Sequence, residues 1–292
     1  MTVEDIIGNT PIIKLESIPT NPKVTIYCKL EGQNPGGSVK DRAALGMING
    51  ALERGEIELG DKLVEATSGN TGIALAMIAS MKGLQMTLVM PEDATPERIK
   101  SMRAYGAEVL LTPADKTIEY SRTKAEEMAE SGKYFLLNQF GNPDNYRMHY
   151  RTTGPEIWRD TNGDITHFVS AMGTTGTIMG VSRYLKEQNS DIQIVGTQPT
   201  DEASIPGIRR WSPEFLPDFY EPERVDRIVD VSEDEARNMT RRMGKKESIM
   251  AGMSSGGALT AAMQVAQDID HGTIVCITCD RGDRYLSSDL FE

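Results

Sequence analysis

The sequence predicts an α/β protein whose sheets are mostly parallel and carry helices on both faces. Short apolar runs alternate with amphipathic stretches along nearly the whole chain, which is the pattern of repeated strand–helix units. The apolar runs are mostly continuous, as expected of parallel strands that are covered on both faces. At 292 residues the chain is long enough for about two domains with a cleft between them.

Strands are expected where a short apolar run stands between amphipathic stretches. They fall at residues 24–30, 62–66, 86–90, 108–111, 134–137, 166–172, 192–196 and 273–279. Helices are expected at residues 39–54, 71–82, 96–105 and 116–131. A glycine follows each of these helices and a proline opens the third, which are common signals of helix ends.

Composition excludes several classes of partner. The formal net charge of -12 would repel an extended polyanion, so we expect no nucleic-acid partner. Glu4 and Asp5 stand where a signal peptide needs positive charge, and no apolar run approaches the roughly 18 residues of a membrane span. We therefore expect a cytoplasmic protein without a membrane partner.

The cysteines and histidines point to no special chemistry. Three cysteines are an odd number, which suits a reducing compartment better than a disulfide framework. Cys276 and Cys279 have C-x-x-C spacing, but both fall in the expected strand 273–279, where residues three apart point to opposite faces. A structural role therefore outweighs a redox pair. The three histidines lack ligand spacing, so no metal site is expected.

Three junctions that we expect to join a strand to a helix are rich in glycine, serine and threonine, at residues 67–72, 173–177 and 252–257. In an open parallel sheet such junctions lie where ligands bind. The second junction is the best candidate for a phosphate site, because its hydroxyl and amide groups precede a helix. It matches neither a Walker A loop nor a dinucleotide-binding loop. A tight turn that happens to contain threonines remains an alternative.

Lys40 is the candidate nucleophile. It falls in the first turn of the expected helix 39–54, after glycines and with Ser38 as the expected N-cap. The positive end of the helix disfavours a protonated amine there, and a neutral amine is what a Schiff base needs. A lysine near a helix start is, however, more often a solvated surface residue.

These segments together resemble the fold-type II pyridoxal-phosphate enzymes. The resemblance is carried by G-S-V-K-D-R-A at 37–43, E-A-T-S-G-N-T-G at 65–72, M-G-T-T-G-T at 172–177 and G-M-S-S-G-G at 252–257. Residues 7–11, 204–211 and 279–285 are similar to the B type within the cysteine synthase/cystathionine β-synthase family. The likeness covers essentially the whole chain.

The resemblance implies a smaller domain at 35–145, a larger one formed by 1–34 plus 146–292, a cofactor in the cleft between them, and a homodimer. It implies that pyridoxal 5'-phosphate is linked to Lys40. It assigns further cofactor contacts to Asn70, Gly173, Thr174, Thr175, Gly176, Thr177 and Ser254. It assigns the substrate carboxylate to Thr67, Ser68, Thr71 and Gln139.

The implied reaction is a β-replacement. A serine such as Ser254 cannot keep the pyridine nitrogen protonated as a carboxylate would, which favours β-elimination over transamination. Lys40 would remove the α-proton of O-acetyl-L-serine, acetate would leave an aminoacrylate, and sulfide would add to give L-cysteine. The B type also accepts thiosulfate, giving S-sulfocysteine.

The loop at 199–222 is expected to contribute to the binding of thiosulfate. It is long and rich in proline, and loops of this size are usually functional or disordered. Arg209 or Arg210 would attract the anion. The alternative is that both arginines are solvated or hold the loop through carboxylates such as Glu202.

Other functions fit the sequence less well. Residues 252–256 satisfy the G-x-S-x-G pattern of serine hydrolases, but only His271 follows the serine, and no acid–histidine order is evident. A non-catalytic cofactor-binding protein would have lost Lys40 or the 67–71 loop, and both are present. Within the family, cystathionine β-synthase and serine or threonine dehydratase are the alternatives.

Overall fold

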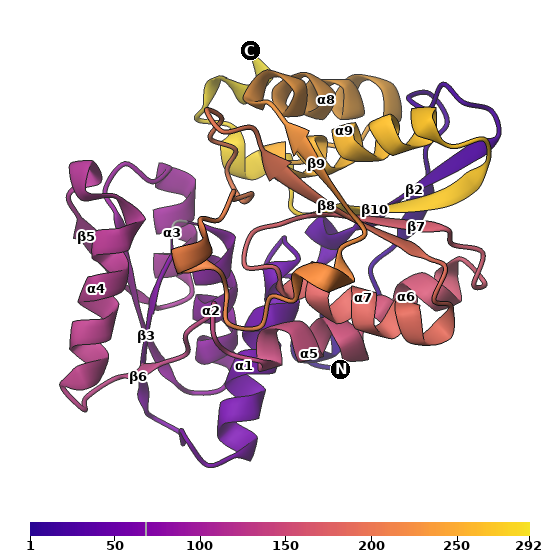
Figure 1. Ribbon diagram of the computed structural model, residues 1–292. Helices are drawn as coiled ribbons and strands as arrows, with labels where there is room; N and C mark the ends of the chain where they lie inside the picture. Colours follow the sequence, from indigo (N-terminus) through magenta and orange to yellow (C-terminus); the bar gives the residue numbers. More distant parts are fainter. Residues whose placement is uncertain (68) are drawn as a thin grey trace.

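The computed structural model describes residues 1–67 and 69–292, and the strands of these residues form two sheets (Figure 1). The larger sheet contains β1 (Ile12–Lys14), β2 (Val24–Leu30), β7 (His167–Ala171), β8 (Gln193–Pro199), β9 (Arg227–Val231) and β10 (Gly272–Thr278). The smaller sheet contains β3 (Lys62–Ala66), β4 (Gln85–Pro91), β5 (Glu108–Thr112) and β6 (Phe135–Leu136). The strand orders are β1-β2-β10-β7-β8-β9 and β5-β4-β3-β6. The β1–β2 pair is antiparallel and the other pairs are parallel.

Helices cover both faces of the smaller sheet. They are α1 (Lys40–Glu53), α2 (Asn70–Met81), α3 (Pro96–Ala104) and α4 (Thr117–Glu130). Helix α4 packs on β3 and β4 from one side, and α2 packs on β4 from the other, with α1 and α3 against α2. Residues 71–79 of α2 are all buried because the helix lies between the sheet and α1. The apolar sequence of α2 therefore follows from its central place.

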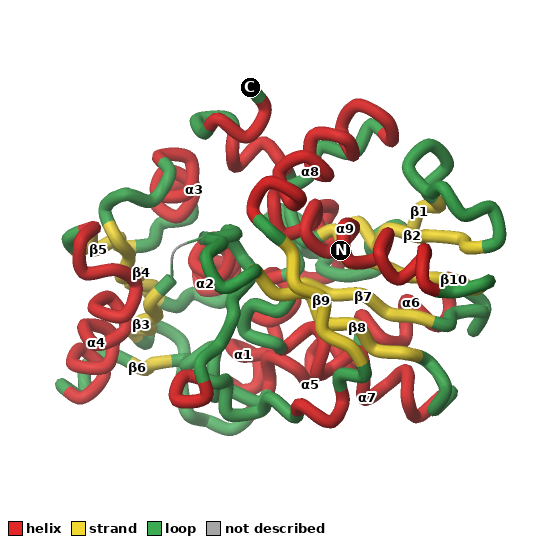
Figure 2. Tube along the Cα trace, turned by 45° about the horizontal axis from the view of Figure 1, so that its top comes forward, coloured by secondary structure: helices red, strands yellow, loops and turns green. Residues whose placement is uncertain are grey.

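The larger sheet is also covered on both faces (Figures 1 and 2). Its helices are α5 (Asp144–Arg151), α6 (Thr153–Asp160), α7 (Gly176–Gln188), α8 (Glu233–Glu247) and α9 (Met253–Asp268). Helices α5, α6 and α7 lie on one side, and α8 and α9 lie on the other. Helix α9 packs on four neighbouring strands and beneath α8, so most of its residues are buried. The two sheets thus have separate apolar cores.

The predicted α/β class is confirmed, and every expected strand and helix is present within a few residues. The sequence does not predict β1 or β9. Both are edge strands, β1 with three residues and β9 with exposed side chains at Arg227, Ile228 and Asp230. Such segments lack the continuous apolar run that marks a covered strand.

Three local predictions are wrong. Helix α1 begins at Lys40 and its N-cap position is Val39, although Ser38 still contacts the first turn. Strand β10 ends at Thr278, so Cys279 does not lie in it. The junction at 252–257 follows α8 and opens α9, so it joins two helices and not a strand to a helix.

The connections place the polar loops between the two sheets. The carboxyl ends of β3, β7 and β10 lead into three segments that meet around one cavity: residues 67 and 69–70, residues 172–176, and residues 279–285. The loop between β8 and β9, residues 200–226, extends from the larger sheet towards the smaller one (Figure 1). We call it the arginine loop. The fold therefore brings together segments that are far apart in the chain.

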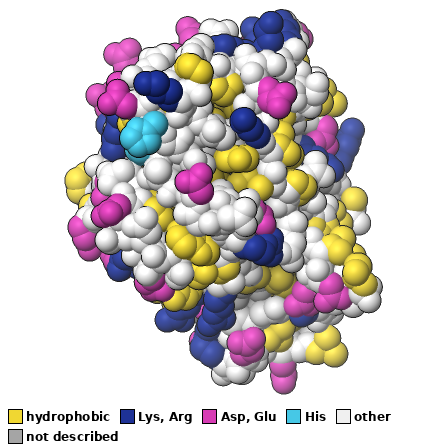
Figure 3. All heavy atoms as spheres, turned by 90° about the vertical axis from the view of Figure 1, so that its right-hand side faces the viewer, with side chains coloured by type: hydrophobic (Ala, Val, Ile, Leu, Met, Phe, Trp, Pro, Cys, Tyr) yellow, Lys and Arg dark blue, Asp and Glu magenta, His cyan; other side chains and the backbone are white. Residues whose placement is uncertain are grey.

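Two surface properties bear on partners. Within residues 1–67 and 69–292, no helix is long and apolar enough to cross a bilayer. On the face shown in Figure 3, lysine and arginine side chains are interspersed with acidic and apolar ones. That face has no extended basic surface of the kind that nucleic-acid binding uses.

Candidate active site

A cavity of 430 Å³ lies between the two sheets. The predicted site residues in its wall are Lys40, Thr67, Asn70, Thr71, Gln139, Gly173, Thr174 and Arg209. Thr175, Gly176, Thr177 and Ser254 are buried beside this wall. Arg210 lies at a neighbouring cavity, and Ser68 lies outside the described residues. The fold thus gathers most of the predicted residues at one place.

Lys40 is the first residue of α1, and its side chain enters the cavity. Burial lowers the pKa of its amine, while the nearby Cys279 and Asp280 partly oppose that shift. Among the described residues, no hydrogen bond or ion pair to the amine is found. A Cβ atom added to Gly173 would lie 4.0 Å from Nζ of Lys40. Lys40 is therefore a partly buried lysine whose amine has a lowered pKa, which is the state that favours nucleophilic attack.

The segment between β3 and α2 forms one polar wall. Oγ1 of Thr67 accepts hydrogen bonds from the backbone N–H groups of Gly69 and Gly72, at 3.2 and 3.3 Å. The hydroxyl of Thr71 donates to Oε1 of Gln139 at 2.9 Å, and Nε2 of Gln139 donates to the carbonyl oxygen of Ala66 at 3.1 Å. These bonds fix the start of α2, whose positive end suits a carboxylate.

Residues 173–177, which we call the threonine loop, border another part of the cavity, which Gly173 and Thr174 line directly. Thr175 has a φ of 66°, a left-handed conformation that is strained for a β-branched residue. Its Oγ1 is buried without a partner among the described residues. Helix α7 begins directly afterwards, at Gly176. A strained backbone, an unpaired buried hydroxyl and a helix N-terminus together fit a bound phosphate group.

Two residues that the sequence does not predict support the threonine loop. Nδ2 of Asn145 donates to Oγ1 of Thr174 at 3.2 Å, and a Cβ atom at Gly176 would lie 2.0 Å from Oδ1 of Asn145. Nε2 of His149 lies 3.3 Å from Oγ1 of Thr177. Burial and the nearby Arg42 lower the pKa of His149 to about 3, so its ring is neutral. Both side chains come from α5, and no local pattern connects them with the loop.

Asn70 is held by two residues from the end of the chain. Nη1 of Arg284 donates to Oδ1 of Asn70 at 2.6 Å, and Nδ2 of Asn70 donates to Oδ2 of Asp280 at 2.7 Å. The hydroxyl of Tyr285 also donates to Oδ2 of Asp280, at 2.8 Å. Burial raises the pKa of Asp280, whereas these donors and Arg284 oppose that shift.

Ser254 and Cys279 lie next to each other at the start of α9. Ser254 is buried behind Gly207, where an added Cβ atom would lie 3.3 Å from Cβ of Ser254. The Cys279 thiol interacts with the hydroxyl of Ser254, and burial raises the pKa of that thiol to about 12. The thiol therefore stays protonated at neutral pH. Cys279 belongs to this site, whereas Cys276 lies in the core of the sheet.

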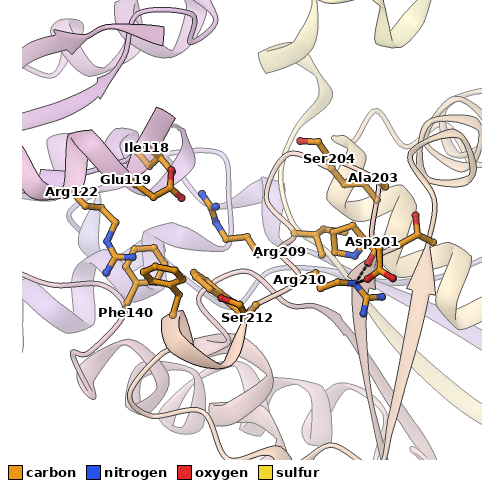
Figure 4. A pocket seen from close by; sticks show the side chains of 16 residues that line it. Ile118, Glu119, Arg122, Phe140, Asp201, Ala203, Ser204, Arg209, Arg210 and Ser212 are labelled. Atoms are coloured by element: carbon orange, nitrogen blue, oxygen red, sulfur yellow. Dashed lines mark hydrogen bonds and ion pairs between the residues drawn. The ribbon is translucent and has the colours of Figure 1, made fainter. Parts of the chain in front are cut away.

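The two predicted arginines have different surroundings. Arg209 lines the main cavity and a second one of 340 Å³, and its guanidinium lies 5.6 Å from the ring centre of Trp211. Figure 4 shows it directed towards Glu119 and Arg122 of α4. Arg210 instead pairs with Asp201 at 3.1 Å and Asp230 at 2.6 Å.

Arg210 thus has contacts of the kind that the alternative describes, although its partners are aspartates and not Glu202. Nε of Arg210 also donates to the carbonyl oxygen of Pro199, at 2.9 Å. For Arg209, the pKa is lowered by burial, with an opposing contribution from Glu119 and a further lowering by Arg122. Its guanidinium makes no ion pair that is found among the described residues.

The serine hydrolase alternative lacks a geometric basis. Ser254 lies in the first turn of α9, which follows another helix, whereas a nucleophile elbow follows a strand. His271 comes after the far end of the same helix, about 20 Å along its axis at 1.5 Å per residue. That separation prevents a serine–histidine pair.

Comparisons with known proteins agree with this geometry. A family model described as pyridoxal-phosphate dependent enzyme matches residues 3–280. Cysteine synthase B of Pseudomonas aeruginosa is 53% identical over 291 residues, which are 100% of this chain and 97% of that protein. Among solved structures, a cysteine synthase from Entamoeba histolytica has 37% identity and a TM-score of 0.94, covering 99% of this chain and 90% of that one. An O-acetylserine-dependent cystathionine β-synthase from Helicobacter pylori has 38% identity and a TM-score of 0.92, covering 100% and 99%.

Proposed function

We propose that this chain, which belongs to the pyridoxal-phosphate-dependent enzyme family, is a cysteine synthase that converts O-acetyl-L-serine and sulfide to L-cysteine and acetate. The observation that carries the proposal is the position of Lys40. Its amine enters a cavity that is bordered by the threonine loop, which suits a phosphate, and by the start of α2, which suits a carboxylate. The similarity to cysteine synthase B over the full chain supports the same reaction.

The cofactor contacts are proposed from this arrangement. Lys40 would hold pyridoxal 5'-phosphate covalently, and the threonine loop would hold its phosphate. Asn70 would contact the ring oxygen, and Ser254 would face the ring nitrogen. When bound, the cofactor supplies an electron sink for the α-carbon of the substrate. The unpaired Oγ1 of Thr175 is the clearest support, because it lacks a partner that a phosphate oxygen would supply.

Substrate binding and proton transfer use the remaining residues. Thr67, Thr71 and Gln139 would bind the α-carboxylate at the start of α2. Ser68 belongs to the same proposed set, although it lies outside the described residues. The Lys40 amine would take the α-proton, because a lowered pKa keeps it able to act as a base near neutral pH. Departure of acetate then opens the β-carbon to the sulfur donor.

Arg209 is the proposed contact for an anionic donor such as thiosulfate. It lines both cavities, whereas Arg210 is occupied by Asp201 and Asp230. The 340 Å³ cavity beside the main one is larger than sulfide needs. That room also favours a second candidate, a cystathionine β-synthase that takes a larger thiol donor such as homocysteine. The H. pylori protein is described as an O-acetylserine-dependent cystathionine β-synthase.

The decisive assay is product formation from O-acetylserine with sulfide, thiosulfate or homocysteine as the donor. We expect cysteine from sulfide and S-sulfocysteine from thiosulfate. If cystathionine is the preferred product, the protein is a cystathionine β-synthase, the second candidate, and not a cysteine synthase. Absence of acetate release with every donor would contradict the proposed function.

The domain division also remains a proposal. The smaller sheet lies within 35–145, while β1 and β2 join the larger sheet with strands from 146–292. This pairing supports a smaller domain at 35–145 and a larger one at 1–34 plus 146–292. The homodimer and the cytoplasmic location stay predictions.

A further inference from the structure

We propose that Asp280 and Arg284 are positioning residues that fix the amide of Asn70 so that an N–H group faces the ring oxygen of the cofactor. This inference rests on the proposed function, in which Asn70 contacts that oxygen. Asn70 lines the cavity, while Asp280 and Arg284 approach it from the segment after β10. They are separated from Asn70 by more than 200 residues of chain.

The charges of the two partners decide how the amide is oriented. A guanidinium can only donate hydrogen bonds. Oδ2 of Asp280 is an acceptor in this structure, because the hydroxyl of Tyr285 also donates to it. Arg284 must therefore meet Oδ1 of Asn70, and Asp280 must meet Nδ2, as the 2.6 and 2.7 Å contacts show. The reversed amide would place oxygen against carboxylate and NH₂ against guanidinium. One N–H of Nδ2 remains for a ligand, so Asn70 presents a donor.

The surrounding packing holds the two positioning residues in place. Arg284 donates from Nη2 to the carbonyl oxygen of Gly36. Gly37 has a φ of +83°, and a Cβ atom there would lie 2.5 Å from Nη2 of Arg284. A Cβ atom at Gly252 would lie 2.3 Å from Oδ1 of Asp280. Gly37 and Gly252 therefore leave the space that the side chains of Arg284 and Asp280 fill. The contacts of these two side chains to Asn70 thus depend on residues 36–37, on residue 252 and on residues 280–284.

A fixed donor has a chemical consequence for the ring oxygen. Hydrogen bonding to a charged form favours that form, so the N–H of Asn70 would stabilise the ionised oxygen over the protonated one. An amide free to rotate would present its own oxygen for part of the time, which has the opposite effect. The two forms of the cofactor absorb in different bands, one visible and one near-ultraviolet. Their ratio reports the orientation of Asn70.

The test uses the holoenzyme and compares Arg284→Met, Arg284→Lys and Asp280→Asn with the wild type. We expect Arg284→Met to lower the ratio of visible to near-ultraviolet absorbance about tenfold, the size of one hydrogen bond, and Arg284→Lys to restore part of it. Asp280→Asn should also lower it, because an amide can accept or donate. Arg281→Met is the matched control, since Arg281 is half-exposed in the same segment and pairs with Asp283.

The same variants in an Asn70→Ala background separate positioning from a general structural role. There Arg284→Met should no longer change the absorbance ratio, because the amide through which it acts is gone. An equal change with and without the amide, or an unchanged ratio in Arg284→Met and Asp280→Asn, would overturn the inference while leaving the proposed function intact. A wild-type protein that binds no cofactor would contradict the proposed function and the inference together.

Discussion

Trp211 donates a hydrogen bond from Nε1 to the carbonyl oxygen of Gly173, with a distance of 2.7 Å. The bond joins the arginine loop to the first residue of the threonine loop. A second link is the hydrogen bond from the backbone N–H of Arg209 to the carbonyl oxygen of Met172, at 2.8 Å. Arg209, in cation–π contact with Trp211, is therefore held beside the proposed cofactor site.

This placement predicts different effects for the two neighbouring arginines. Arg209→Ala should lower kcat/KM for thiosulfate about tenfold to hundredfold, the value of one charge-assisted contact, and affect sulfide much less. Arg210→Ala should affect both donors alike, because Arg210 holds the loop through Asp230 and Asp201. Steady-state kinetics with O-acetylserine and each donor measure both effects. If Arg209→Ala keeps the wild-type ratio between donors, Arg209 does not bind the anion.

Thr175 should show a trade-off between stability and cofactor binding. Thr175→Gly removes a strained left-handed threonine, so the apoprotein should gain about 1 kcal/mol in free energy of unfolding. The same change removes the unpaired Oγ1 and should raise the cofactor dissociation constant about tenfold. Denaturant unfolding of the apoprotein and cofactor titration test the two parts. Thr175→Ser, which keeps the hydroxyl, should bind the cofactor nearly as well as the wild type.

His149 predicts a specific dependence of stability on pH. Its pKa is about 3 in the folded protein because of burial and Arg42, and the ordinary value is 6.5. Because the pKa is lower in the folded state, the stabilisation from the neutral ring is fully present above pH 6.5. It is lost as the pH falls from 6.5 towards 3, since only the unfolded protein then takes up the proton. The loss is about 1.4 kcal/mol per pH unit in that range.

The comparison is between the wild type and His149→Gln at pH 7 and pH 5. Relative to the variant, the wild type should lose about 2 kcal/mol of unfolding free energy between these pH values. The variant lacks only the titrating ring of His149. The contributions of the other titrating groups are therefore the same in both proteins and cancel when the two unfolding free energies are subtracted. A stability difference that is the same at both pH values would show that His149 is not held neutral.

The fold and the site could be predicted from the sequence where the information is local. Lys40 and the threonine loop stand within a few residues of glycines and helix starts, and the covered strands are continuous apolar runs. The structure places Lys40 and the threonine loop beside the same cavity.

The supporting residues could not be predicted because their role depends on contacts across the chain. Nothing near Arg284 or His149 in the sequence points to Asn70 or Thr177, and only the meeting of the sheets brings them together. The different roles of Arg209 and Arg210 likewise depend on Asp230, which lies on β9, an edge strand that the sequence pattern does not reveal.

The most direct test of the central claim is borohydride reduction of the holoenzyme followed by peptide mapping. In the wild type we predict that the reduced cofactor is found on the peptide that contains Lys40. Lys40→Ala should carry no reducible link, whereas the control Lys124→Ala, which removes an exposed lysine on α4, should be labelled like the wild type. A reducible link on another lysine in the wild type, or a normal link in Lys40→Ala, would contradict the account.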